Sequence, residues 1–592
     1  FIAFLQFFYL YQLVATADVG GISFSAGSIG LIILSLFSVY WFFQVIAALC
    51  SATRLRLIIG VCIGFSLYDI LIAYQFKSQN LLNWSVIASN FQEAFSVEAW
   101  EVMFNNLDGE ALVYIPIVLG LYLVLEYFRH TLSKSRQRAP LLKKSLAGLA
   151  VYLILILNPF DSYDPLVNFF RSILHHYQNP INLEIQYPSS SPHTKSSATF
   201  DSIQLPKQAK RPHIFLIVCE SLNENRIHRY TEDGKAITPF LNQLSENSVR
   251  PLLFYGNSVQ TAKGYFSILF SSIPTLTGKT FVNNKELRVK SLADALNTRG
   301  YHSLLFSGHD NPNFDNYKPF MTARGLDFVL SKPYVPKDAI WRSWGPEDSG
   351  FFDAFFNYYD QELKGDDSPL FVILKTASHH FPFHPSRQLI YPDADGINED
   401  FDNSTYLTDL GVQRFFERLK AYPEFKNSMI IVTSDHAFPL GEHGDYNLES
   451  GYHEESFRIP FFLTWEGVLK PGIIHRPSSQ LDIAPTILDL LDINDFDSQF
   501  IGDSIFSDSQ NPIYLIQPYV KHLSVVRYPL KYRFNTRLQK EYLYNLVDDP
   551  MEERNILSTL STEDYQVFKR DLEAIYISDY LIQKNLFWPE DK

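Results

Sequence analysis

The sequence predicts a protein of two parts: an N-terminal α-helical transmembrane bundle of about five spans, and a C-terminal α/β domain with a mostly parallel sheet. Apolar runs long enough to cross a hydrocarbon core about 30 Å thick fall within the first 160 residues. From residue 213 onward, short apolar runs alternate with helical stretches instead. The composition agrees, since 46% of the 592 residues are hydrophobic and only 19% are charged.

Five apolar runs are candidate membrane spans, at residues 1–14, 29–49, 57–76, 111–128 and 145–158. The first run begins without Met and without a basic segment, so it resembles a shortened span rather than a signal peptide. The loop 129–144 carries six basic residues and no acidic one, whereas the loop 77–110 is mainly acidic. Short basic loops stay in the cytoplasm, so alternation of the spans places the chain after residue 158 outside it.

The chain after the last span divides into a connecting segment and a large domain. Residues 188–212 are poor in apolar side chains and rich in Ser, Lys and Pro, a composition typical of a linker. The predicted organisation is therefore a transmembrane domain at 1–160, a juxtamembrane segment and linker at 161–212, and a separate domain at 213–592.

In the C-terminal domain, continuous apolar runs of strand length predict strands that are buried on both faces. They lie at residues 213–219, 302–307, 369–376, 428–434 and 458–465. Helix starts are indicated by Thr238 before Pro239 and by Ser291, whose helix should end at Gly300. Strands that alternate with helices favour a parallel sheet, in which ligands bind beyond the carboxyl ends of the strands.

Charge and cysteine content exclude some classes of protein. The formal net charge of −14 argues against a chain that neutralises nucleic acid phosphates, so no nucleic acid partner is expected. Cys62 lies in an apolar run and Cys50 directly follows one, so only Cys219 falls in the C-terminal domain. That domain therefore has neither a disulfide framework nor a cysteine zinc site.

Polar side chains follow three of the predicted strands. Glu220 follows the run 213–219, Asp435 and His436 follow 428–434, and His380 lies shortly after 369–376. Carboxylates and an imidazole at one edge of a sheet suit a divalent metal, whereas the alternative role of Glu220 or Asp435 taken alone is to cap the following helix.

A hydroxyl suited to nucleophilic chemistry precedes another predicted helix. Thr261 stands before AKGYFSILFSS, so its side chain would lie at the positive end of a helix dipole, where phosphate binds readily. Its alternative role is that of a simple N-cap. Coordination to a metal would lower the pKa of this hydroxyl and make it a nucleophile near neutral pH.

Several motifs resemble those of a known superfamily. The segments TSDHAFPLGEHGDY (433–446), RIPFF (458–462) and LDIAPTILDLL (481–491) are similar to those of the sulfatase and alkaline phosphatase superfamily. With five spans before the domain, the chain resembles the lipoteichoic acid synthase-like branch of membrane phosphotransferases. The resemblance implies an extracytoplasmic sulfatase-like catalytic domain on the multi-pass plasma or inner membrane of a bacterium.

The resemblance also implies roles for individual residues. One divalent metal would be bound by Glu220, Thr261, Asp435 and His436. Oxygen-rich ligation with one imidazole favours Mn²⁺, with Mg²⁺ or Zn²⁺ as alternatives. Thr261 would be the nucleophile, and His380 would assist catalysis and contact substrate. The other expected substrate-binding residues are His309, His443 and His453.

The implied function is transfer of a phospholipid head group through a phosphothreonine intermediate. The donor would be a membrane phospholipid, and the acceptor a hydroxyl-bearing glycan or lipid of the cell envelope. Phosphoglycerol is the favoured head group, but the Trp and Arg expected after His309 are replaced by Phe314 and Asn316. Phosphoethanolamine transfer, phosphodiester hydrolysis and an inactive lipid-binding role remain alternatives, whereas the C/S-x-P-x-R motif of true sulfatases is absent from the sequence.

Overall fold

A computed structural model describes residues 211–588, apart from positions 277, 343, 384, 386, 388, 395, 447, 449, 450, 519–521, 537 and 538. The five predicted spans and the linker up to residue 210 lie outside these described residues. Within the described residues, no helix combines the length and the apolar character needed to cross a membrane.

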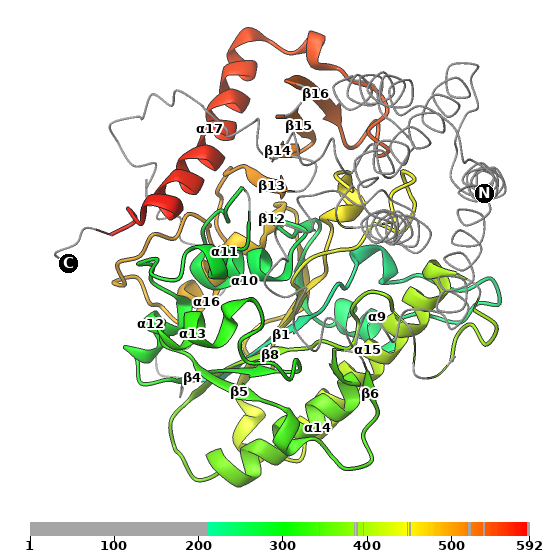
Figure 1. Ribbon diagram of the computed structural model, residues 1–592, viewed down its shortest axis with the longest axis vertical. Helices are drawn as coiled ribbons and strands as arrows, with labels where there is room; N and C mark the ends of the chain where they lie inside the picture. The colour runs from blue at the N-terminus through cyan, green and yellow to red at the C-terminus, as the bar shows by residue number, and fades with distance from the viewer. Residues whose placement is uncertain are drawn as a thin grey trace, which may run out of the picture. The chain divides into compact units, whose positions relative to one another are not determined.

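The centre of the domain is an eight-stranded sheet, with strand order β11-β2-β10-β9-β1-β8-β4-β5 (Figure 1). The five consecutive strands from β9 to β5 in this order run parallel to one another, as the sequence predicts. Their bounds are β9 Ser428–Ser434, β1 His213–Cys219, β8 Leu370–Lys375, β4 His302–Ser307 and β5 Asp327–Leu330.

The opposite end of the sheet departs from the parallel arrangement. Strand β10 (Phe461–Trp465) pairs antiparallel with β9 and with β2 (Val249–Pro251), and β11 (Gly472–Ile474) closes this edge. The predicted strand 458–465 is therefore three residues too long at its start, where Arg458 forms an isolated bridge with Tyr255.

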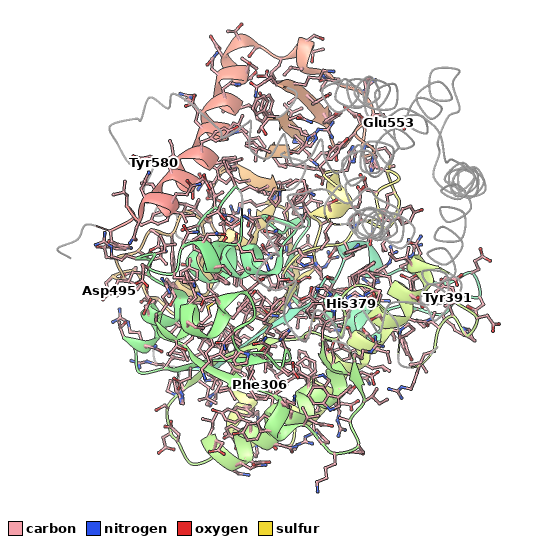
Figure 2. All side chains as sticks on the ribbon, viewed as in Figure 1. Phe306, His379, Tyr391, Asp495, Glu553 and Tyr580 are labelled. Carbon is pink, nitrogen blue, oxygen red and sulfur yellow. The ribbon has the colours of Figure 1, made fainter. Side chains whose placement is uncertain are left out.

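Helices cover both faces of the sheet (Figure 1). Alternate residues of β1 supply the two cores, since Phe215 and Ile217 face one layer while Ile214 and Leu216 face the other. The first layer contains α9 Pro239–Glu246, α14 Asp348–Tyr358 and α15 Ile397–Leu419. The second contains α10 Thr261–Phe270, α12 Leu292–Asn297, α13 Tyr317–Thr322 and α16 Ile483–Leu490. The dense side-chain packing is visible in Figure 2.

Two predicted helix starts are present, but they are capped differently. Ser291 caps α12 through a reciprocal capping box, as the sequence predicts. Thr238 precedes α9 but makes no side-chain capping bond. Instead, the carboxylate of Asp409 in α15 accepts hydrogen bonds from the backbone N–H groups of Phe240 and Leu241, at 3.0 and 2.7 Å. A residue distant in sequence therefore satisfies the free donors of α9.

A smaller antiparallel sheet follows the main sheet along the chain. It consists of β13 Ile513–Gln517, β14 His522–Arg527, β15 Leu530–Asn535 and β16 Lys540–Asn545. Helix α17 (Thr562–Lys584) packs on it through Phe568, Leu572 and Ile575. The backbone N–H of Ile516 donates to the carbonyl of Asn257, which joins this sheet to the segment before α10.

Candidate active site

Glu220 and Asp435 lie side by side because their strands are neighbours in register. Cys219, the last residue of β1, pairs with Ser434, the last residue of β9, so each carboxylate occupies the next position along its chain. Both side chains are buried, with exposed fractions of 3% and 1%. The backbone N–H of Ser221 donates to Asp435 Oδ1 at 3.0 Å and fixes the orientation of that carboxylate.

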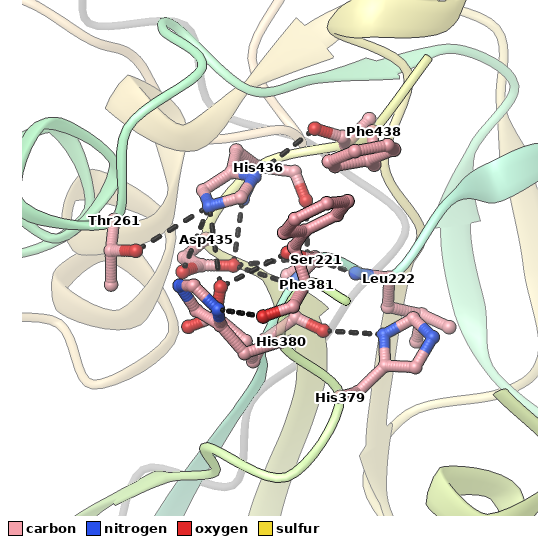
Figure 3. Close-up of polar contacts among 12 residues, drawn as sticks. Ser221, Leu222, Thr261, His379, His380, Phe381, Asp435, His436 and Phe438 are labelled. Atoms are coloured by element: carbon pink, nitrogen blue, oxygen red, sulfur yellow. Dashed lines mark hydrogen bonds and ion pairs between the residues drawn. The ribbon is translucent and has the colours of Figure 1, made fainter. Parts of the chain in front are cut away.

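His436 connects these carboxylates to Thr261 (Figure 3). Its Nε2 lies 3.4 Å from Glu220 Oε1, 3.6 Å from Asp435 Oδ2 and 3.4 Å from Thr261 Oγ1. Its Nδ1 lies 3.0 Å from the carbonyl oxygen of Ala437, to which it donates. That bond leaves Nε2 as the ring atom directed at the three oxygens, the arrangement usual for a metal-binding histidine.

The donor set fits a divalent cation. Ligand atoms of Glu220, Asp435 and His436 all lie within 4.8 Å of one another, and Asp435 Oδ2 is buried without a hydrogen-bond partner in the described residues. A buried carboxylate oxygen without a partner is costly unless a cation binds it. The structure thus brings together the three residues that the sequence places at one edge of the sheet, and their role as metal ligands stays a prediction.

The pKa values of the three groups reflect burial and mutual charge. Burial, followed by the charge of Glu220, raises the pKa of Asp435 to about 6. Burial would also raise the pKa of Glu220, but the hydrogen bond with His436 and the nearby histidine charges hold it well below its usual range. Burial opposes protonation of His436, yet the charges of Asp435 and Glu220 raise its pKa to about 9. The pocket therefore attracts positive charge.

Thr261 reaches this cluster from the first turn of α10. Gln260 is the N-cap residue and Thr261 is the first helical residue, so the alternative that Thr261 is only an N-cap is wrong. One turn later, Gly264 lies against the backbone carbonyl of Asp435, where a Cβ would overlap it. Glycine at this position allows α10 to approach the strand end closely.

An aromatic wall lies beside His380. The imidazole of His380 packs on Trp344 with ring centroids 4.2 Å apart, and His309 stacks on Phe314 at 4.5 Å. Trp344 is also 5.7 Å from His309, so it joins the two histidines that the sequence singles out. Burial lowers the pKa of His309 to about 4 and also lowers that of His380, which favours neutral rings.

Trp344 is a site residue that was not predicted from the sequence. It lies in the turn between β6 (Trp341–Arg342) and β7 (Gly345–Pro346). A Trp next to Gly-Pro in a short loop was the available signal, but nothing local indicates that this loop folds toward His380.

His443 and His453 form a cluster of their own with Glu455. His443 donates from Nδ1 to Glu455 Oε1 at 2.8 Å and from Nε2 to the carbonyl of Met551 at 2.7 Å. The rings of His443 and His453 stack with centroids 3.8 Å apart. In the described residues no contact connects this pair with Thr261, so its predicted substrate role stays a prediction.

Comparison with known proteins defines the class of this domain. Residues 212–493 match the model of the Sulfatase family, so this part of the chain is a sulfatase-family domain of the sulfatase and alkaline phosphatase superfamily. Members of that superfamily use a divalent metal, which agrees with the donor set described above.

Among characterised relatives, lipoteichoic acid synthase 2 of Bacillus subtilis is 26% identical over 325 residues, which cover 52% of this chain and 49% of that protein. The lipoteichoic acid synthase of Staphylococcus aureus is 24% identical over 500 residues, covering 80% of this chain and 72% of its own. The chain thus spans about half the length of the Bacillus subtilis relatives that it matches.

Two solved structures share the fold. The lipoteichoic acid synthase LtaP of Listeria monocytogenes superposes with a TM-score of 0.55 at 21% identity, over 66% of this chain and 98% of that chain. An alkaline phosphatase superfamily protein of Vibrio parahaemolyticus also gives 0.55, at 19% identity over 65% and 90% of the two chains. These similarities establish the sulfatase-like α/β fold.

Proposed function

We propose that this protein transfers the phosphoglycerol head group of a membrane phospholipid to a hydroxyl acceptor through a covalent intermediate on Thr261. The observation that carries the proposal is the position of the Thr261 hydroxyl at the start of α10, 3.4 Å from His436 Nε2 and beside two buried carboxylates. The similarity to lipoteichoic acid synthases supports phosphoglycerol as the head group.

One divalent ion, with Mn²⁺ favoured, would be held by Glu220, Thr261, Asp435 and His436. When bound, such an ion lowers the pKa of a coordinated hydroxyl and offsets negative charge on transferring oxygens. The orientation of His436 by the Ala437 carbonyl leaves its Nε2 available for this purpose.

The reaction we propose has two displacements. Thr261 Oγ1 attacks the phosphorus of the donor phosphodiester, the bond from phosphorus to the diacylglycerol oxygen breaks, and diacylglycerol leaves. The acceptor hydroxyl then attacks the phosphothreonine, and Thr261 is released. Each displacement moves one proton from the attacking hydroxyl to the departing oxygen, and we assign the relay of that proton to His380, whose ring is kept neutral by burial.

The location of the enzyme follows from the same proposal. Residues 1–160 would anchor the chain in a bacterial membrane, residues 161–212 would connect it, and residues 213–592 would face outward. A lipid donor and an acceptor glycan or lipid of the envelope are both present on that side. Reporter fusions after Lys144 and Lys207 should therefore report opposite sides of the membrane.

The full chain in detergent, supplied with Mn²⁺, tests the reaction. Phosphatidylglycerol and phosphatidylethanolamine, each with a fluorescent diacylglycerol moiety, should be compared for release of diacylglycerol. We expect release from phosphatidylglycerol, a phosphoglycerol adduct on Thr261 in the intact mass, and loss of about 1,000-fold or more in Thr261→Ala. The control Thr322→Ala, at an exposed threonine of α13, should match the parent.

Two outcomes would reject the proposal. Release from phosphatidylethanolamine alone would change the head group. Activity of Thr261→Ala within about tenfold of the parent would move the nucleophile to another residue.

A further inference from the structure

Lys375 is a buried cation without a counter-charge in contact with it. It is the last residue of β8 and only 6% exposed. Its ammonium forms no hydrogen bond and no ion pair with the residues that the structure describes. Two aromatic rings lie near it, with Nζ 5.7 Å from the ring centroid of Tyr265 and 5.2 Å from that of Tyr317.

Strand register places Lys375 between the two halves of the candidate active site. On one side it pairs with Val218 of β1, two residues before Glu220. On the other side it pairs with Ser307 of β4, two residues before His309. Its positive charge therefore acts both on the carboxylates of Glu220 and Asp435 and on the rings of His309 and His380.

Tyr265 and Tyr317, whose rings lie near this ammonium, add two hydroxyl groups. Both are buried, and neither hydroxyl has a hydrogen-bond partner within the described residues. Tyr265 lies one turn after Thr261 on α10, while Tyr317 is the first residue of α13. Their rings meet edge to face with centroids 5.7 Å apart. Two helices and a strand thus bring an ammonium and two tyrosine rings together, and one of these helices also carries Thr261.

Such an arrangement is unfavourable unless a ligand completes it. A buried hydroxyl without a partner loses its hydrogen bonds to water and gains none in return, and an ammonium largely removed from water without a counter-charge in contact is unfavourable too. A tetrahedral phosphoryl group brings negative charge and several acceptor oxygens, which matches an ammonium and two hydroxyl donors.

We propose that Lys375, Tyr265 and Tyr317 form an anion pocket that binds a phosphoryl group next to Thr261. The pocket would hold oxygens of the donor phosphate other than those facing Glu220 and Asp435. Identification of the anion as a lipid phosphodiester rests on the proposed function, whereas binding of inorganic phosphate does not.

Phosphate affinity of the full-length, metal-loaded protein tests the pocket. Calorimetry with inorganic phosphate should show affinity at least about tenfold weaker for Lys375→Met than for the parent, with unchanged metal content. Lys375→Arg should retain most of the affinity, because the guanidinium restores the charge. The control Lys263→Met removes another buried lysine, which already donates to Thr275, and should bind phosphate like the parent.

Removal of the two hydroxyls gives a test that does not depend on the lysine. Because these hydroxyls have no partner, Tyr265→Phe and Tyr317→Phe should leave thermal stability unchanged or increase it, while phosphate affinity falls about threefold or more. Unchanged phosphate affinity in Lys375→Met and in both Phe variants would overturn the proposal. Loss of metal together with phosphate affinity in Lys375→Met would also overturn it, since Lys375 would then serve the metal site.

Measurements of turnover distinguish the anion-pocket proposal from the proposed phosphoglycerol transfer. With phosphatidylglycerol as donor, Lys375→Met should raise KM more than it lowers kcat. If no lipid releases diacylglycerol but phosphate affinity still depends on Lys375, the proposed function fails and the anion pocket stands. If Thr261-dependent turnover is found with phosphate affinity and KM independent of Lys375, the pocket fails and the function stands.

Discussion

Gly264 of α10 packs directly against the backbone carbonyl of Asp435, with no space between them for a side chain. Thr261 precedes Gly264 by one turn of the same helix, and Asp435 is a candidate metal ligand. The distance of Thr261 from the candidate metal ligands is therefore set by a contact between helix backbone and strand end.

Gly264→Ala should damage both folding and activity. Its Cβ would overlap the Asp435 carbonyl, so α10 must move, at a cost of about 1–3 kcal/mol in the free energy of unfolding. Displacement of Thr261 should lower turnover by about tenfold or more. Thermal unfolding and diacylglycerol release measure the two effects. Gly472→Ala is the control, because a Cβ there meets nothing within 4 Å; equal activity in both variants would contradict this role of Gly264.

Metal binding should depend on the buried cluster at the ends of β1 and β9. Asp435→Asn keeps the side-chain shape but removes the charge of a ligand, and His436→Gln removes the imidazole, so metal affinity should fall by about tenfold to a hundredfold or more. Elemental analysis after gel filtration measures the bound ion. Glu455→Gln alters the other candidate cluster and should retain the metal. Loss of the ion only in Glu455→Gln would move the site to His443 and His453.

Removal of the metal should also lower stability. A ligand present at 100 times its Kd and bound only to the folded state stabilises that state by about 2.7 kcal/mol. Dialysis against EDTA should therefore lower Tm, and Mn²⁺ should restore it. In Asp435→Asn the Tm should hardly respond to EDTA, which distinguishes this site from any other metal-binding site on the chain.

The site residues whose positions the sequence predicts are those that directly follow strands of the parallel sheet. Apolar runs locate β1 and β9, and parallel neighbours bring the residues after them together, so Glu220 and Asp435 could be paired in advance. An apolar run does not show strand direction. The strand β10 was therefore predicted, but its antiparallel direction was not. The capping of α9 by Asp409 and the contact of Trp344 with His380 depend on packing between distant segments, which local patterns do not encode.

Trp344 should contribute to donor binding. Its ring packs on His380 and lies near His309, so Trp344→Ala should raise the KM for the lipid donor by about tenfold, the loss of a contact of 1–2 kcal/mol. Trp344→Phe should keep part of this contact. Trp341→Ala is a matched control on the same hairpin, since Trp341 is 43% exposed. Equal KM values for Trp344→Ala and Trp341→Ala would exclude Trp344 from the donor site.

The pH dependence of stability should reveal whether His443 is structural. Its hydrogen bond with Glu455, together with the Met551 carbonyl, raises the pKa of His443 to about 9 in the folded protein. An unfolded histidine titrates near 6.5, so the folded state binds the proton more tightly. This contribution is complete below about pH 6.5 and is lost as the pH rises through about 9.

The difference in Tm between the parent and His443→Gln should therefore be largest near pH 6 and should shrink by pH 9.5. Both proteins should be metal-loaded, because His436 would otherwise titrate in the same range. Glu455→Gln should reduce the pH dependence in the same way, since it replaces the charged carboxylate that accepts the His443 proton with a neutral amide. A Tm difference that is constant from pH 6 to pH 9.5, combined with lost turnover in His443→Gln, would instead favour the predicted role of His443 in substrate binding.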